Sequence, residues 1–330
     1  METDANALRR SSTRILANQL LANQPANWQN QALALANQAF TWANQPACRR
    51  QISFFNCENV QVAHFVSTTD IRGKFLLLGT GTSVGVPVIG CDCAVCTSDN
   101  PRNRRFRCAA AVGLPGGTLL IDTPPDLRTQ LLRAGLGAVD AVAFTHEHAD
   151  HLYGMDEIRL FQFYLGGAVP IYCEKFVEDR IRHVFDYAFS QQPPTHAGAT
   201  PQIEFRRIDT SPFEALGARI QPIRLQHGPR FKVLGFRIGN LAYCTDTNEI
   251  PAESWSLLEG LDYLILDALR IAPHPTHFNL EEAVAVARKI GAQQTYFTHL
   301  CHDLEHDATN ARLPAGMQLA YDGLELPLTN

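Results

Sequence analysis

From Lys74 onward, the chain alternates short apolar runs with polar or glycine-containing breaks. Runs of four to eight apolar residues bounded by turn residues are typical of buried strands. The pattern therefore predicts many strands, each near one of these segments: KFLLLGTG, RCAAAV, TLLID, DAVAFTH, VPIYC, ARIQPIRL, FKVLGFRI, LAYCTD, DYLILDAL and QTYFTH.

Helices are expected between these strands, over residues 125–134, 155–165, 174–190 and 279–290. The last is the best delimited: Asn279 can cap its start, Glu281 and Glu282 lie in its first turn, and Gly291 follows its end. Strands mixed with flanking helices predict an α/β fold in which helices cover the sheets.

The first 73 residues have a different character. The tetrapeptide LANQ begins at Leu16, Leu21 and Leu35, and WANQ begins at Trp42. Low-complexity segments rich in Ala, Asn and Gln bury little apolar surface. We therefore expect an N-terminal extension of unknown function over residues 1–73 and a catalytic domain over residues 74–330.

Composition narrows the class of protein. A hydrophobic fraction of 45% is ample for a large core, and a net charge of −5 argues against a general nucleic-acid-binding surface. No run approaches the about 18 apolar residues of a membrane span. Nine cysteines without an export signal favour a reducing compartment, so a cytoplasmic location is expected.

Polar residues stand where the apolar strands end. Because strand ends on one rim of a layered fold can converge, these residues are expected to share a site. They are Asp122, His146, Asp246, Asp267 and His299.

The densest cluster is Thr145-His-Glu-His-Ala-Asp-His151. His146 and His148 project to one side of an extended segment, and Asp150 and His151 follow in the turn. Three imidazoles and a carboxylate within six residues are the donors that divalent metals bind, and such crowding argues against a merely solvated loop. Together with later strand-end residues they can complete two metal sites. The first would contain His146, His148 and His227. The second would contain Asp150, His151 and His299, and Asp246 would bridge the two.

This H-x-H-x-D-H motif, followed by separate His, Asp and His residues, resembles the metallo-β-lactamase superfamily of binuclear hydrolases over residues 74–322. The resemblance implies an αββα sandwich with two catalytic divalent ions, Zn²⁺ or Mn²⁺. Asp122 matches an early aspartate that orients a ligand histidine, although a turn or helix-cap role is the alternative. Asp122 and Asp150 are counted among the catalytic residues.

Phosphodiesterase members of that superfamily carry a histidine near the start of the last long helix. His277 matches it better than His274, because the helix begins directly after His277. An imidazole suits proton donation to a departing alkoxide, since its pKa lies near working pH. His274, between two prolines, remains the rival.

The segment Ile89-Gly-Cys-Asp-Cys-Ala-Val-Cys96 could hold a redox pair, part of a zinc site or merely reduced thiols. In one branch of the superfamily, the phosphoribosyl cyclic phosphodiesterases, such a motif binds a structural zinc. The resemblance to that branch implies Cys91, Cys93, Cys96 and His302 as ligands, with Cys301 a bystander. Cys₃His is a common closed zinc set.

The function expected from these features is metal-dependent hydrolysis of a small cyclic phosphate or nucleotide-like phosphodiester. The alternatives are a thioester or lactone hydrolase on the same scaffold, and a non-catalytic metal-binding protein like a coenzyme PQQ-biosynthesis relative. Stable nucleic-acid binding is not expected, because no long basic arm is present and the chain is acidic. A homodimer is left open.

Overall fold

The computed structural model describes residues 68–329 except 191–194 and 197, and the backbone of four short strands before them. These strands form two antiparallel pairs, Arg50–Gln51 (β1) with Phe65–Val66 (β4) and Phe55–Cys57 (β2) with Val60–Val62 (β3). The LANQ repeats lie outside the described residues. The expected boundary at Lys74 stays a prediction; Ile71, just before it, is buried.

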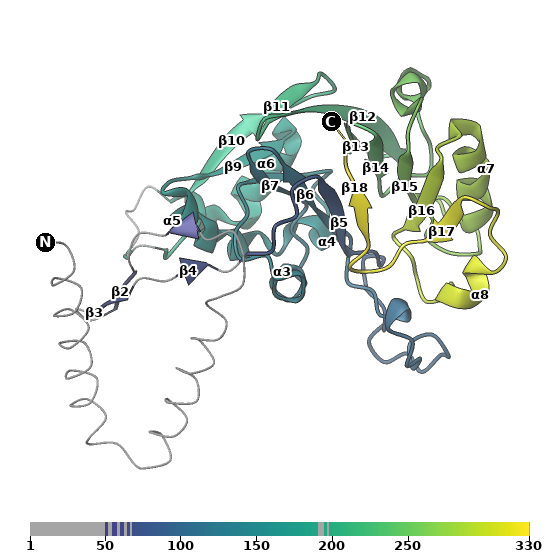
Figure 1. Ribbon diagram of the computed structural model, residues 1–330, viewed down its shortest axis with the longest axis horizontal. Coiled ribbons are helices and arrows are strands. Elements are labelled where there is room, and N and C mark those ends of the chain that lie inside the picture. Colours follow the sequence, from purple (N-terminus) through teal and green to yellow (C-terminus); the bar gives the residue numbers. More distant parts are fainter. Residues whose placement is uncertain are drawn as a thin grey trace, which may run out of the picture. The chain divides into compact units, whose positions relative to one another are not determined.

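Seven strands form the first sheet (Figure 1). Strands β7 to β10 run parallel to one another, whereas β18, β5, β6 and β7 pair antiparallel. In spatial order the sheet contains Ile203–Arg207 (β10), Val169–Cys173 (β9), Ala141–Ala143 (β8), Gly117–Ile121 (β7), Ala109–Leu114 (β6), Lys74–Gly79 (β5) and Glu325–Pro327 (β18).

The second sheet also has seven strands and changes direction in the same way. Strands β11 to β14 pair antiparallel and β14 to β17 parallel, so the carboxyl ends of three central strands meet at one edge. In spatial order it contains Phe213–Ala215 (β11), Ala218–His227 (β12), Phe231–Ile238 (β13), Leu241–Cys244 (β14), Tyr263–Asp267 (β15), Gln294–Thr298 (β16) and Met317–Leu319 (β17).

Helices and 3₁₀ turns connect the strands close to where the sequence predicts them. Asn279 caps the helix α7 in a reciprocal capping box with Glu282, and Gly291 ends it in the left-handed conformation. The helices are Leu127–Ala134 (α3), Ala149–Leu152 (α4), Phe161–Leu165 (α5), Lys175–Val184 (α6), Leu280–Ile290 (α7) and His306–Asn310 (α8); the 3₁₀ turns are Pro101–Asn103 (η1), Met155–Leu160 (η2), Asp186–Phe189 (η3) and Ala252–Leu258 (η4).

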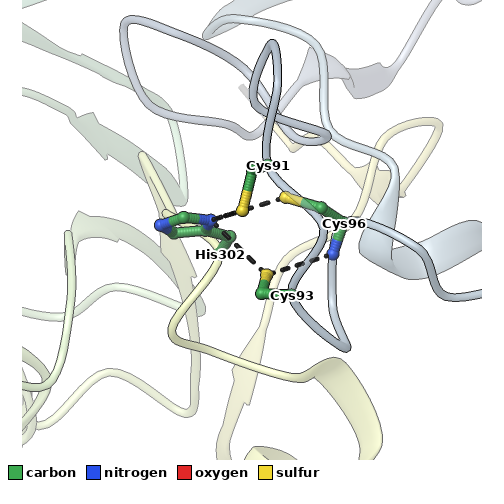
Figure 2. A group of neighbouring side chains, drawn as sticks. All are labelled: Cys91, Cys93, Cys96 and His302. Atoms are coloured by element: carbon green, nitrogen blue, oxygen red, sulfur yellow. Dashed lines mark hydrogen bonds between the residues drawn. The ribbon is translucent and has the colours of Figure 1, made fainter.

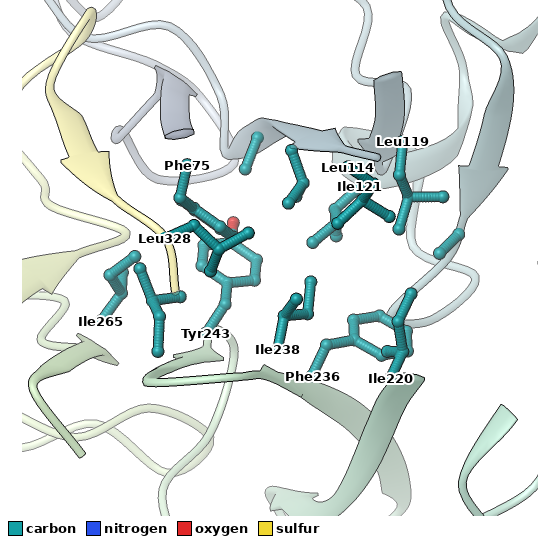
Figure 3. Close-up of a cluster of buried hydrophobic side chains, with 14 of the residues drawn as sticks. Phe75, Leu114, Leu119, Ile121, Ile220, Phe236, Ile238, Tyr243, Ile265 and Leu328 are labelled. Carbon is teal, nitrogen blue, oxygen red and sulfur yellow. The ribbon is translucent and has the colours of Figure 1, made fainter. Parts of the chain in front are cut away.

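Side chains of β5 show how the layers arise. Phe75 and Leu77 point into the core between the two sheets, while Leu76 and Leu78 pack into a second core beneath α3, α5 and α6. Because both faces are buried, the strand reads as a continuous apolar run. Figure 3 shows the core between the sheets, where Phe75 lies near Tyr243 of the opposite sheet.

A third apolar cluster lies on the outer face of the second sheet, under α7 and η4. The order helix, sheet, sheet, helix confirms the predicted αββα sandwich. Within the part of the chain that the structure describes, no helix is both long and apolar enough to span a bilayer.

Candidate metal centre

The loop after β8 carries the densest group of imidazoles. The backbone of Thr145 accepts a hydrogen bond of 3.0 Å from the Leu234 amide of the second sheet, which ties the loop to both sheets. His146 is buried, and its Nε2 lies 2.9 Å from Nδ1 of His148. The single-turn helix α4 then carries Asp150 and His151, whose ligand atoms lie within 4.8 Å of each other.

Three other site residues follow strands in a rare backbone conformation. Asp122, Asp246 and His299 have φ values of 64°, 56° and 60°. This left-handed region is unfavourable for residues other than glycine and tends to be retained at functional sites. Asp122 directly follows β7, His299 directly follows β16, and Asp246 lies two positions after β14. The chain therefore turns sharply at the end of each strand.

The imidazoles of His146, His148 and His227 form a first group, with ligand atoms all within 4.8 Å of one another. His227 ends β12, and its Nδ1 donates a hydrogen bond of 2.8 Å to the Thr276 carbonyl. This bond leaves Nε2 free to bind an ion.

Asp150, His151, Asp246 and His299 form a second group of the same tightness. Oδ2 of Asp246 lies 3.1 Å from Nε2 of His151, and its Oδ1 lies 3.2 Å from Nε2 of His299. Asp246 also belongs to a group with His227. The structure therefore brings together all seven residues expected at the two sites, and Asp246 lies within ligand distance of members of both groups.

The two groups differ in their electrostatics. Burial lowers the pKa of His146, His148 and His227, so these imidazoles are neutral and can act as ligands. Burial alone would raise the pKa of Asp246, but the imidazoles of His151 and His299 hold it well below its usual range. A buried carboxylate needs such positive charge, which a bound ion also supplies.

Two buried nitrogen atoms point to the same conclusion. Nε2 of both His151 and His299 lies near an Asp246 oxygen but makes no hydrogen bond of good geometry to the described protein. Buried polar atoms are normally satisfied, and exceptions call for an explanation such as an ion. The donors present, imidazole nitrogens and carboxylate oxygens, fit Zn²⁺ or Mn²⁺. We call this group of seven residues the histidine–aspartate centre.

Asp122 lies behind the centre and holds His151. Its Oδ2 accepts a 2.8 Å hydrogen bond from Nδ1 of His151, and its two carboxylate oxygens accept bonds of 2.8 Å from the Thr145 amide and hydroxyl. The ring of His151 is thereby oriented with Nε2 toward Asp246. This geometry favours the orienting position over a cap role, because Asp126 occupies the N-cap of α3.

His277 lies beside the centre, and His274 does not join it. The His277 ring stacks on His299 with centroids 4.5 Å apart, and it forms ligand-distance groups with His227 and Asp246. His274 belongs to no such group among the described residues and accepts hydrogen bonds from Thr276.

Asp267 is the site residue whose role the sequence pattern did not reveal. It ends β15, and its Oδ2 accepts a 2.7 Å hydrogen bond from Nδ1 of His277. The Thr247 amide donates to the same oxygen at 3.2 Å. The pairing fixes the ring so that Nε2 of His277 is the free nitrogen. Its strand-end position was the only available signal.

The three cysteines converge on His302 from more than 200 positions away in sequence (Figure 2). Nδ1 of His302 lies 3.3, 3.6 and 3.4 Å from the sulfurs of Cys91, Cys93 and Cys96. These four residues, here called the cysteine cluster, offer the donors of a closed zinc site. Cys301 lies outside it, its sulfur accepting from the Asp303 amide.

Hydrogen bonds from Arg105 stabilise the loop that carries His302. This buried guanidinium donates bonds of 2.7 Å to the Cys301 carbonyl and 2.6 Å to the Leu304 carbonyl. The glycine-rich loop after β5 lies alongside, since the Thr82 amide donates to the Leu300 carbonyl at 3.1 Å. The loops that carry the cysteines and the last metal-centre histidine are therefore packed as one unit.

Residues 118–300 match the model of a beta-lactamase superfamily domain. The chain belongs to the metallo-β-lactamase superfamily. A solved structure of a new diphosphatase from the PhnP family matches at 46% identity and a TM-score of 0.71, over 77% of this chain and 96% of that chain. This similarity places the chain in the PhnP branch that the cysteine motif indicated.

Two further matches add detail. Zn²⁺-bound PqqB from Methylobacterium extorquens shares the metallo-β-lactamase fold at 19% identity and a TM-score of 0.64, covering 77% of this chain and all 100% of its own. An octanoyltransferase of Porphyromonas gingivalis (strain ATCC BAA-308 / W83) is 37% identical over 256 residues, which are 76% of this chain. The chain spans about half, 51%, of that curated relative's length.

Proposed function

We propose that this metallo-β-lactamase-fold hydrolase is a phosphodiesterase with two catalytic metal ions that cleaves a small cyclic phosphate or nucleotide-like phosphodiester. The observation that carries the proposal is the pair formed by His277 and Asp267, which lies against the histidine–aspartate centre. A phosphodiester needs a proton donor for its departing alkoxide, and this imidazole is placed to be one.

Each residue then has a defined task. Divalent ions held by the seven residues of the centre would activate water and neutralise charge on the phosphate. His277 in its protonated form donates the Nε2 proton to the leaving oxygen and is left as a neutral ring. Asp267, which accepts from Nδ1, stabilises the protonated ring before that transfer and keeps Nε2 as the donating nitrogen. Asp122 orients the His151 ring so that its Nε2 can bind an ion. The cysteine cluster would hold a structural zinc.

The test combines metal analysis with a substrate panel. Purified protein should contain more than two metal ions per chain, counting the cysteine cluster, and should hydrolyse bis(p-nitrophenyl) phosphate or a five-membered cyclic phosphate. About one ion or none would contradict the two-ion centre. Cleavage of thioesters alone would contradict the phosphodiesterase.

The octanoyltransferase relative favours a second candidate, hydrolysis of an acyl thioester on the same scaffold. Its name describes transfer of an octanoyl group, and this chain matches only about half of that protein. An octanoyl thioester belongs in the same panel. Turnover there that exceeds phosphodiester turnover, and that survives substitution of His277, would favour this candidate, because a thiolate leaves without needing a proton donor.

A further inference from the structure

The turn between β12 and β13 places an aromatic ring next to the metal centre. His227 ends β12, Phe231 begins β13, and the two residues are direct partners in the antiparallel register. Side chains of directly opposed residues project to the same face of a sheet. Phe231 therefore projects to the side on which His227 faces the centre.

The ring contacts the candidate ligands and also reaches solvent. Its centroid lies 4.6 Å from that of His148 in an edge-to-face arrangement, and 6.1 Å from that of His227. Phe231 is nevertheless 37% exposed. A large aromatic side chain left partly exposed at a buried polar centre has apolar surface available for another group.

Hydrogen bonds stabilise the turn. Gly228 has a φ of 62°, and its amide donates to the Asn248 side chain at 2.6 Å. The Gln226 side-chain amide donates to the Phe231 carbonyl at 3.1 Å. A rigidly presented ring loses little conformational entropy when a ligand packs on it, so it is well suited to recognition.

We infer that Phe231 forms a subsite for the nucleobase of a nucleotide-like phosphodiester whose phosphate lies at the metal centre. The inference rests on the proposed phosphodiesterase and adds the substrate class. A base on the phosphate ester can reach a ring that adjoins His148. Any of the planar nucleobases can stack on an aromatic side chain, so the contact does not select one base.

Two esters with the same leaving group isolate this contact: thymidine 5′-p-nitrophenyl phosphate and methyl p-nitrophenyl phosphate. The metal-loaded full chain should have a higher kcat/KM for the nucleoside ester. In Phe231→Ala this preference should fall by about tenfold, the scale of a lost base stack. Phe231→Tyr should retain the preference, and Phe231→Leu, which keeps apolar bulk without the ring, should lose most of it.

Lys232→Ala is the matched control. Lys232 is an exposed neighbour that pairs with Gln226, so its side chain lies on the opposite face of the sheet from Phe231. This variant should keep the wild-type preference. Metal content should be unchanged in all four variants, which separates a base contact from an effect on His148.

The outcomes distinguish this inference from the function on which it rests. If both esters are cleaved and Phe231→Ala slows them equally, or loses metal, Phe231 only packs on the ligands and the subsite is refuted. If neither ester is cleaved, the phosphodiesterase proposal fails. Calorimetric titration with thymidine 5′-monophosphate then decides the subsite alone: weaker binding to Phe231→Ala than to Lys232→Ala supports it, and equal binding refutes it.

Discussion

The cysteine cluster and the histidine–aspartate centre differ in what they leave available. The cysteine cluster offers three sulfurs and one nitrogen around a single point, which is a complete tetrahedral set. The centre offers nitrogen and oxygen donors in two groups, and Asp246 of the second group is also within ligand distance of His227 in the first and of His277. A closed set of four donors fits a structural ion, whereas the three imidazoles of the first group leave a fourth coordination position for water or substrate.

The backbone shows the same difference. Among described non-glycine residues with positive φ, Asp122, Asp246 and His299 all belong to or support the centre, and Leu216 is the remaining one. The loop of the cysteine cluster turns at Gly85 and Gly90 instead, with φ of 67° and 76°. Strained conformations are thus concentrated where chemistry is proposed, and the cysteine loop turns without that cost.

The largest expected effect comes from removing a buried ligand of the centre. His146→Ala leaves His148 and His227 short of a three-imidazole group, so turnover should fall to background. The loss should exceed the about 10- to 100-fold typical of residues that merely support a ligand. Elemental analysis should show the centre depleted while the cysteine cluster keeps its zinc. Loss of all metal would show that the two sites are not independent.

His277→Ala tests the chemistry without removing a ligand. The kcat for a phosphodiester with an alkoxide leaving group should fall by about 100- to 10,000-fold, the usual contribution of a proton donor. Metal content should stay at the wild-type level. His274→Ala is the matched control and should change kcat little. Equal losses in the two variants would remove the special role of His277.

Asp122→Asn and Asp267→Asn compare two carboxylates that each hold one imidazole. Each substitution should lower one property by about 10- to 100-fold, but the property should differ between the two variants. The first should weaken metal binding, measured by competition with a chelator, because Asp122 orients His151. The second should lower kcat at saturating metal, because Asp267 orients His277. If both variants shift only metal affinity, the pair with Asp267 is structural.

The residues of the histidine–aspartate centre could be proposed from local sequence pattern, whereas His302 followed only from the family resemblance. An apolar strand followed by a polar residue marks a strand end, and the parallel strands β14, β15 and β16 bring such ends to one edge. The start of α7 was equally clear, since Asn279 and Glu282 form a local capping box. Signals of this kind involve few neighbouring residues and do not depend on the tertiary fold.

Features that depend on pairing were missed. Strand β10 is largely exposed, and β18 consists of three residues including a proline, so neither has an apolar run; each exists because it pairs with β9 or β5. The contact of Asp267 with His277 requires the loop between β15 and α7 to fold back. The position of Phe231 beside the metal centre could be recognised only from its pairing with His227.

The smallest expected effect on turnover comes from Cys93→Ala. Three donors remain, so the proposed structural zinc should be lost or weakly held, and its binding energy would no longer contribute to folding. The Tm should fall on the order of 10 °C, because loss of a metal site is among the larger single-residue effects. Turnover should largely persist below that Tm, since Arg105 still holds the loop between His299 and Leu304.

Cys301→Ala is the control and should keep its zinc. If Cys93→Ala instead abolishes turnover while it remains folded, the cysteine cluster positions His299 directly, and the division between a structural and a catalytic site must be abandoned.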